Sequence, residues 1–569
     1  MNPPVWLRPG LVGLLLLLSP VNLPLTDGDT AYYALIAQRM VESGDWFTLR
    51  YPGSDALVDK PPLTIWLIAA SYLIFGVNEL AIRLWHVLMS VGTVILLQAT
   101  AVRFFAREAA SLAGWVLLTS ILFVYCAFVP QQDMPLTFFS TLAFYGLARF
   151  ITDRRWRWTY LFWTSLALGL LARGPQAVLF PGLVAALTLF GVRWIALRNT
   201  GPGRPAVPTG TSPASVAGHL LLGGALFLAI GAPLFVHQYL THGWAIIDLL
   251  LGRGQSRFLA DLDTGGPTIL HFWSYFPLLF VAVLPWSGWL VPSVLHGWRR
   301  LRRTGAGASV QYGGATEPGT GSSASLGLVL FGTWFLVAFL LPFLIQWRVI
   351  RYLLPALPPL AVLIADSAHS GGPRLTRTAA WMSMLIAAPV VVVVAVAYAG
   401  AFPEEQSVYV GFLTPFLAVV SIAVTGFAGL AVIGRRPRAA LTTLVVGSLL
   451  AYAVLFQSLG NYREELLPEY AASRVLASRP EPAVIAGSPI GPSLAFYAQR
   501  AGAMRLSSPA DARRFLESHG SLLILGPSAQ TGLLVRELGT SGDLLWDGAG
   551  YAIVRAAKTA ADEDKRPSP

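Results

Sequence analysis

The chain has 569 residues and a formal net charge of +11, and it is 55% hydrophobic but only 12% charged. Soluble proteins average about 25% charged residues, so this composition, with a mean hydropathy of +0.60, excludes an ordinary soluble protein and predicts a polytopic membrane protein. The positive charge does not indicate nucleic-acid binding, because the Arg residues punctuate apolar runs as topology signals do. The single cysteine, Cys126, excludes an intramolecular disulfide.

Apolar runs long enough to cross a bilayer recur along the chain, and we count about thirteen. The first is interpreted as an uncleaved span, because no cleavage site of the signal-peptide type follows it. The predicted spans are 9–26, 79–102, 109–129, 134–150, 157–172, 175–192, 218–239, 270–294, 325–345, 352–366, 377–399, 409–433 and 439–457.

Charge orients these spans. With the N-terminus inside the cell, the inner loops hold most of the Arg residues, including the clusters at 154–157, 299–303 and 435–438, as the positive-inside rule requires. We therefore predict a mainly α-helical, multi-pass membrane protein with a cytoplasmic N-terminus. Its predicted parts are a transmembrane domain (1–458), a small extracytoplasmic α/β domain (459–556) and a disordered tail (557–569).

The first outer loop, 27–78, contains two predicted interfacial helices. "DTAYYALIAQRMVESG" offers Asp29 as an N-cap and Gly44 as a stop, with an apolar face between them. "PPLTIWLIAASYLIFG" begins with Pro and ends with Gly, and it is short for a full span. The region after about residue 460 alternates strand-like runs, such as "SLLILG" and "YAIVRA", with helix-like ones.

Acidic groups at a membrane surface are costly unless they pair or act. Asp27 and Asp29 follow the first span, and Asp133 begins a later one. A metal–nucleotide site does not fit Asp27 and Asp29, since nucleotide sugars are cytoplasmic and these residues are predicted outside. Helix capping is the structural alternative for both Asp29 and Asp133, and either residue can serve both purposes.

Cations converge on the same predicted face. Lys60, beside Asp59, is one of only three Lys among the 40 Lys and Arg, and Arg173, Arg257 and Arg351 are also predicted there. Carboxylates alone would suit a cation, but carboxylates together with these cations indicate an acid–base group that faces a phosphate. His271, among interfacial aromatics, is a supporting candidate, although an aromatic belt around a structural His explains it equally well.

Several segments in order along residues 9–370 resemble one family as a set. They are "DGDTAYYALIAQRMVESGDW", "DKPPLTIWLIAASYLIFGVNELAIRL", "DMPLTFFSTLAFY", "LLARGP" and "RYLLPALPPLAVL". The chain resembles the GT-C membrane glycosyltransferases that use polyprenyl-phosphate sugars. Its nearest relatives within them are the aminoarabinose transferases that modify lipid A, and the protein O-mannosyltransferases are more distant.

The resemblance implies roles for individual positions. Asp29 matches the family's essential carboxylate, and Asp133 matches the Asp that precedes the fourth span. Candidates for binding the donor phosphate are Lys60, Arg173, Arg257, Arg351 and Tyr352. Supporting positions are Asp27, Tyr32, Tyr33, Asp59 and His271.

Two departures concern a metal. The aminoarabinose transferases carry Glu where Asp59 stands, and a His at the position of Gly254, and they use this pair to hold a metal ion. No cofactor is therefore predicted with certainty, and a divalent metal at Asp59 stays open. The expected partners are a polyprenyl-phosphate sugar donor and a lipid, glycan or protein acceptor, with the chain acting as a monomer without nucleic acid.

The resemblance implies a protein of the bacterial inner membrane that transfers a sugar on its outer face, with inversion at the anomeric carbon. The alternative is a transporter or flippase for lipids or lipid-linked sugars. Transporters often show internal repeats and ionisable groups at the bilayer midplane. This chain shows no repeat, and its ionisable groups gather at one surface, which favours an enzyme. A degenerate relative that acts as a scaffold is a third interpretation.

Overall fold

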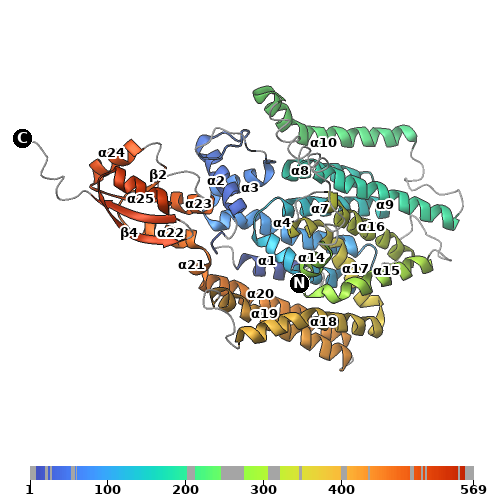
Figure 1. Ribbon diagram of the computed structural model, residues 1–569. Coiled ribbons are helices and arrows are strands. Elements are labelled where there is room, and N and C mark those ends of the chain that lie inside the picture. Colours follow the sequence, from blue (N-terminus) through green and yellow to red (C-terminus); the bar gives the residue numbers. More distant parts are fainter. Residues whose placement is uncertain are drawn as a thin grey trace, which may run out of the picture.

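The structure is a computed structural model. It describes residues 8–19, 23–25, 28–52, 58, 60–200, 212–244, 275–304, 321–344, 349–398, 407–433, 436–486, 492–500, 504–505, 509–548 and 551–557. Within these ranges the chain forms a large helical body and a smaller α/β part at one end (Figure 1).

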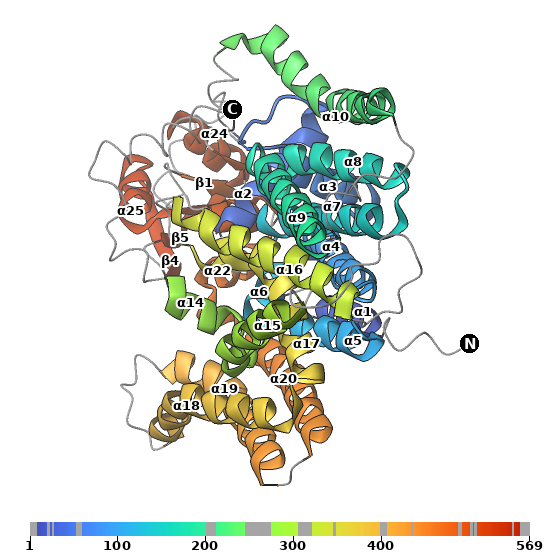
Figure 2. The ribbon, with the colours of Figure 1, turned by 90° about the vertical axis from the view of Figure 1, so that its right-hand side faces the viewer.

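The helical body holds eight described helices that are long and apolar enough to cross a membrane, or nine if a bent pair counts as one span. The predicted number of thirteen therefore stays a prediction. The helices of this body are α1 (Arg8–Leu18), α4 (Glu79–Ala101), α5 (Arg107–Leu118), α6 (Ile121–Phe128), α7 (Asp133–Asp153), α8 (Arg157–Arg173), α9 (Gln176–Thr200), α10 (Pro213–His242), α14 (Tyr275–Ala282), α15 (Leu290–Thr304), α16 (Gly321–Leu340), α17 (Leu357–Ser370), α18 (Gly372–Tyr398), α19 (Ser407–Val432) and α20 (Pro437–Asn461). Helices α18, α19 and α20 form a group on one side (Figure 2).

The span predicted over 109–129 is not one straight helix, because α5 and α6 meet at an angle of 61°. Side chains from distant helices bind the backbone and side chain at the bend. Trp286 Nε1 donates to Thr119 Oγ1 at 2.8 Å, and the Tyr452 hydroxyl donates to the Thr119 carbonyl at 2.9 Å. A broken helix at membrane depth is tolerated where such partners satisfy its polar groups.

The segment predicted to be the first outer loop forms the two predicted helices, α2 (Gly28–Ser43) and α3 (Leu63–Phe75). Gly44, with φ of +70°, and Gly76, with φ of +72°, follow their ends, as predicted. The N-cap interpretation of Asp29 is wrong, because α2 begins at Gly28 and Asp29 lies in its first turn. The two helices pack together, and the Tyr72 hydroxyl contacts the Ala34 carbonyl at 3.4 Å.

The C-terminal part contains a five-stranded sheet in the order β2-β1-β3-β5-β4, parallel from β2 to β3 and antiparallel from β3 to β4. Its core is continuous with the first outer loop, because buried side chains of α2, α3, α23 and the sheet form one cluster. The elements are α21 (Arg463–Leu466), α22 (Pro468–Ala477), β1 (Ala483–Ile485), α23 (Pro492–Arg500), β2 (Met504–Arg505), α24 (Pro509–His519), β3 (Ser521–Pro527), α25 (Ser528–Glu537), β4 (Ser541–Gly548) and β5 (Tyr551–Ala557).

Within the described residues, three short 3₁₀ helices interrupt the helical body, at Trp286–Trp289 (η3), Leu341–Leu344 (η4) and Ile350–Ala356 (η5). Apolar side chains that include the fully buried Trp286, Trp289 and Trp334 fill the space around them. The Trp334 indole donates to the Pro355 carbonyl at 2.9 Å, so η5 is fixed to α16. This fixed position matters because η5 carries two of the predicted site residues.

Candidate functional site

Asp133 is the first residue of α7, and its side chain is 2% exposed. The N-cap interpretation is wrong here too, because Gln132 occupies the cap position and makes no side-chain cap hydrogen bond. The Asp133 carboxylate instead pairs with two guanidinium groups. Its Oδ1 lies 3.0 Å from Arg173 Nη1, and its Oδ2 lies 3.3 Å from Arg351 Nε. A buried carboxylate requires such partners.

Arg173 is the last residue of α8, and Gly174 places it there. Gly174 has a φ of +78°, and its N–H closes the helix on the Leu170 carbonyl at 2.8 Å. The end of α8 also lies against the first outer loop, since a Cβ at Gly174 would sit 3.8 Å from Pro61 Cγ. The Lys60–Pro61 segment therefore lies next to the residue that follows Arg173.

Arg351 and Tyr352 come from η5, and Arg351 joins the two predicted carboxylates. Its Nη2 lies 3.3 Å from Asp29 Oδ2, while its Nε faces Asp133. Tyr352 lies under the other arginine, with the Arg173 guanidinium carbon 5.3 Å from the ring centroid, a cation–π distance. Residues from α2, α7, α8 and η5 thus meet at one cluster.

The two carboxylates differ in access. The Asp29 side chain is 58% exposed, whereas that of Asp133 is 2% exposed. Tyr33, one turn after Asp29 on α2, is 5% exposed. Burial raises the pKa of Tyr33 strongly, and the Asp29 and Asp133 carboxylates add to this against an opposing effect of Arg173. Its phenol therefore stays protonated near neutral pH and can donate a hydrogen bond.

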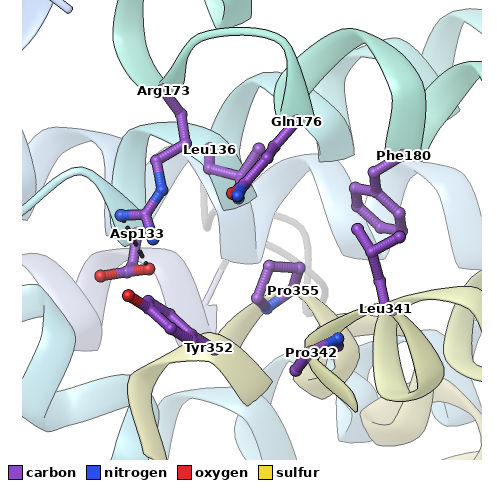
Figure 3. Close-up of a pocket in the computed structure, with 10 residues that line it drawn as sticks. Asp133, Leu136, Arg173, Gln176, Phe180, Leu341, Pro342, Tyr352 and Pro355 are labelled. Atoms are coloured by element: carbon purple, nitrogen blue, oxygen red, sulfur yellow. Dashed lines mark ion pairs between the residues drawn. The ribbon is translucent and has the colours of Figure 1, made fainter. Parts of the chain in front are cut away.

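The cluster borders a small pocket that has a polar end and an apolar end (Figure 3). Arg173 reaches from the end of its helix toward Asp133, and the Tyr352 hydroxyl points to the same place. The polar lining is Asp133, Arg173, Gln176 and Tyr352, and the apolar lining is Leu136, Phe180, Ala338, Leu341, Pro342 and Pro355.

Hydrogen-bonding capacity is left over at the centre of the cluster. Asp133 Oδ2 and Arg351 Nε are buried, and neither has a hydrogen-bond partner in the part of the chain that the structure describes. Their 3.3 Å ion pair is electrostatic but lacks hydrogen-bond geometry. Unsatisfied buried polar atoms are uncommon in folded proteins and often mark sites of function or ligand binding.

The structure brings together six of the predicted site residues: Asp29, Tyr33, Asp133, Arg173, Arg351 and Tyr352. Tyr32 instead stacks on Tyr51, with ring centroids 5.1 Å apart. Lys60 is half-buried, and its neighbour Pro61 lies against Gly174 at the end of α8. Asp27, Asp59, Arg257 and His271 lie outside the described residues, and within the described ranges no three His, Cys, Asp or Glu are grouped to hold a metal.

Sequence reasoning missed Gln176 and the apolar end of the pocket. Gln176 begins α9 only three residues after Arg173, so the turn at "ARGPQ" was the available signal. The apolar residues gave no signal, because Leu, Phe and Pro are ordinary in membrane helices.

Two comparisons of sequence bear on this site. The family described as dolichyl-phosphate-mannose-protein mannosyltransferase matches residues 59–202. An undecaprenyl phosphate-alpha-4-amino-4-deoxy-L-arabinose arabinosyl transferase of Pseudomonas aeruginosa (strain LESB58) is 27% identical over 362 residues, which are 62% of this chain and 58% of that protein. An uncharacterized protein of Aquifex aeolicus is 26% identical over 60% of this chain and 59% of its own length. The alignments thus span less than two thirds of these relatives.

The fold extends the likeness to the whole chain. The crystal structure of ArnT from Cupriavidus metallidurans bound to undecaprenyl phosphate aligns with a TM-score of 0.70 and 18% identity, covering 96% of both chains. The apo structure of the same protein aligns with a TM-score of 0.69. In sequence and in fold, the chain resembles the GT-C membrane glycosyltransferases and, among them, the aminoarabinose transferases.

Proposed function

We propose that the chain is a glycosyltransferase that moves a sugar from a polyprenyl monophosphate to an acceptor at the outer face of a bacterial inner membrane. The observation that carries this proposal is the cluster at the pocket. Two arginines and two carboxylates pair there, and two of their buried atoms, Asp133 Oδ2 and Arg351 Nε, have unused hydrogen-bonding capacity. The pocket beside them is polar at one end and apolar at the other. A lipid-linked sugar has the same two-part character.

The cations would stabilise the leaving group. When the bond between the anomeric carbon and the phosphate oxygen breaks, that oxygen keeps the electron pair, and the carrier phosphate gains negative charge. Arg173 and Arg351 lie where such charge would develop, and charge stabilisation in a dry site is worth far more than in water. Lys60 adds a compact charge from the adjoining loop, and Arg257 is a further candidate from the sequence.

The carboxylates would divide the remaining work. Asp29 is exposed enough to meet an acceptor hydroxyl, so it would accept the hydroxyl proton as the oxygen attacks the anomeric carbon, which inverts that centre. Where the acceptor is a phosphate, no base is needed, and Asp29 would orient it. Asp133 is too buried for this role, and it would hold Arg173 and Arg351 in place.

The test is transfer by the purified, reconstituted protein from defined undecaprenyl-phosphate sugars to lipid A or other envelope acceptors. We expect Asp29→Asn to lower kcat by roughly 10²-fold or more. Glu42→Gln is the matched control, because Glu42 is an exposed carboxylate on the same helix, where its Oε1 accepts a hydrogen bond from Gln38 Nε2 at 2.9 Å. Unchanged transfer by Asp29→Asn would remove Asp29 from the mechanism.

The same assay addresses the donor phosphate. Lys60→Ala should lower kcat/KM for the donor by about 10²-fold, the usual effect of removing one group that stabilises developing charge. Lys60→Arg should recover only part of it, because a planar fork replaces a point charge. If both variants keep the wild-type kcat/KM, Lys60 does not bind the phosphate.

A further inference from the structure

A buried arginine lies in α4, away from the residues that line the pocket. Arg83 is 1% exposed within a helix long enough to span a membrane, where an uncompensated charge is costly. Its guanidinium donates hydrogen bonds to three main-chain carbonyls. Nε donates to Phe128 at 3.2 Å, Nη2 donates to Pro24 at 2.8 Å, and Nη1 donates to Leu23.

These carbonyls belong to two segments, and each segment leads to one of the aspartates. Leu23 and Pro24 come shortly before α2, which carries Asp29. Phe128 ends α6, five residues before Asp133, and its ring also lies under the guanidinium, with a distance of 4.3 Å to the centroid. One side chain therefore ties together the main chains that deliver both carboxylates.

His86 adds a second tie from the same face of α4, since residues three apart on a helix are neighbours. Its Nε2 lies 2.8 Å from the Gln131 carbonyl, two residues before Asp133. A carbonyl only accepts, so Nε2 carries the hydrogen. Thr30, next to Asp29, closes the arrangement by donating from Oγ1 to the Pro130 carbonyl at 3.2 Å.

Satisfying buried carbonyls is an ordinary structural requirement, and any donor could meet it. The distribution of the acceptors indicates more than this. Leu23, Pro24, Phe128 and Gln131 all lie in the two segments that end at the site, so Arg83 and His86 fix how far apart these segments stand. The carboxylates share Arg351, which lies 3.3 Å from each of them, so a shift of either segment would change this shared pairing.

We infer that Arg83 and His86 are positioning residues that set the separation of Asp29 and Asp133 through the main chain. This inference rests on the proposed transfer reaction for its kinetic consequence. Misplacement of reacting groups by about 1 Å can cost about 10²-fold in rate, and such a loss would fall on kcat, because neither Arg83 nor His86 lines the pocket.

The kinetic test uses three variants and a control. Arg83→Lys and His86→Met should lower kcat by about tenfold or more, with KM for the undecaprenyl-phosphate sugar within about threefold of wild type. His86→Gln should recover most of the rate, because its amide nitrogen can replace Nε2 as the donor. Arg107→Lys, at an exposed arginine that begins α5, should leave both constants unchanged. A folded Arg83→Lys with wild-type kcat, a loss confined to KM, or no recovery by His86→Gln would overturn the inference.

Hydrogen exchange tests the ties without transfer. In Arg83→Lys, amides at the start of α2 and at 129–133 should exchange faster than in wild type, while Arg107→Lys should leave them unchanged. Equal exchange in both variants would overturn the inference. Absence of transfer by the wild-type protein, with the expected exchange pattern, would instead overturn the proposed function and leave the ties established.

Discussion

Asp133 pairs with both arginines of the site. One carboxylate, 2% exposed, holds two guanidinium groups in place. Buried ion pairs add little net stability relative to well-packed apolar groups, because desolvation offsets their attraction. Removing one partner is different, since it leaves an uncompensated charge in a dry place. The pair of Asp133 and Arg173 therefore has a testable signature.

Loss of one partner should destabilise the protein more than loss of both. Breaking a buried pair costs about 3–5 kcal/mol, so Asp133→Asn and Arg173→Met should each lower Tm clearly in detergent. The double variant should recover part of that loss, because Arg351 keeps Asp29 as a partner. Transfer should stay low in all three variants. Losses of Tm that simply add would show that the two side chains are not coupled.

Two helix ends differ in what they position. Gly44 ends α2 with a φ of +70°, and Gly174 ends α8 with a φ of +78°. Nothing lies within 4 Å of a Cβ built at Gly44, and the nearest atom at Gly174, Pro61 Cγ, is at an ordinary contact distance of 3.8 Å. An alanine at either position would therefore meet backbone strain but no clash.

The two alanine variants separate strain from function. A sparsely populated backbone conformation costs a non-glycine residue about 1–3 kcal/mol, so Gly44→Ala and Gly174→Ala should both lower Tm. The loss should be at least as large at Gly174, whose ψ of −157° lies in a region essentially restricted to glycine. Only Gly174→Ala should reduce the rate of transfer, because Arg173 is the residue immediately before the strained one. Equal rates in the two variants would mean that the end of α8 does not set the position of Arg173.

Most helix boundaries could be predicted from local residue types, but the bend between α5 and α6 could not. Pro and Gly predicted the limits of α3, and Gly44 predicted the end of α2. The predicted start of α2 was wrong, because Asp29 was interpreted as the N-cap although it lies in the first turn. The bend between α5 and α6 depends on Trp286 and Tyr452, which lie 167 and 333 residues from Thr119, and no pattern within the 109–129 run reports such partners.

At the scale of the molecule, the C-terminal part and the first outer loop share one core. Side chains of α2 and α3 are buried with those of α22, α23 and the sheet. A hydrogen bond crosses the junction, from the Leu25 N–H to the Tyr497 hydroxyl at 2.6 Å. The Tyr497 hydroxyl thus binds the same short segment whose carbonyls bind Arg83.

Tyr497→Phe should therefore weaken the junction. It leaves the buried Leu25 N–H without its acceptor, which costs about 1–3 kcal/mol, and we expect a lower Tm and a reduced rate of transfer. Tyr239→Phe is the control, because Tyr239 is 41% exposed on α10. A Tyr497→Phe protein with the wild-type Tm would show that water replaces the hydroxyl at no cost.

The site as a whole was partly predictable. Six of the predicted residues lie together in the structure. They could be predicted because the resemblance placed them on one face and because charged residues are easily recognised in an apolar sequence. Their pairing was not predictable, since Asp133 contacts Arg351 across 218 positions of the chain (351 − 133). The pocket's apolar end was not predictable either, because its Leu, Phe, Ala and Pro residues match the composition of every span.

The cluster contains two carboxylates and two guanidinium groups, so it is electrically balanced before any substrate arrives. Under the proposed reaction, a phosphodiester donor brings one negative charge, and the spent carrier leaves as a monoester with about −1.5 to −2 at pH 7. The arginines would therefore hold the product more tightly than the donor. Asp29 and Asp133 compete with the carrier phosphate for the same arginines, so re-forming these ion pairs would promote release of the carrier. Turnover would then depend on this exchange of ionic partners as much as on bond cleavage.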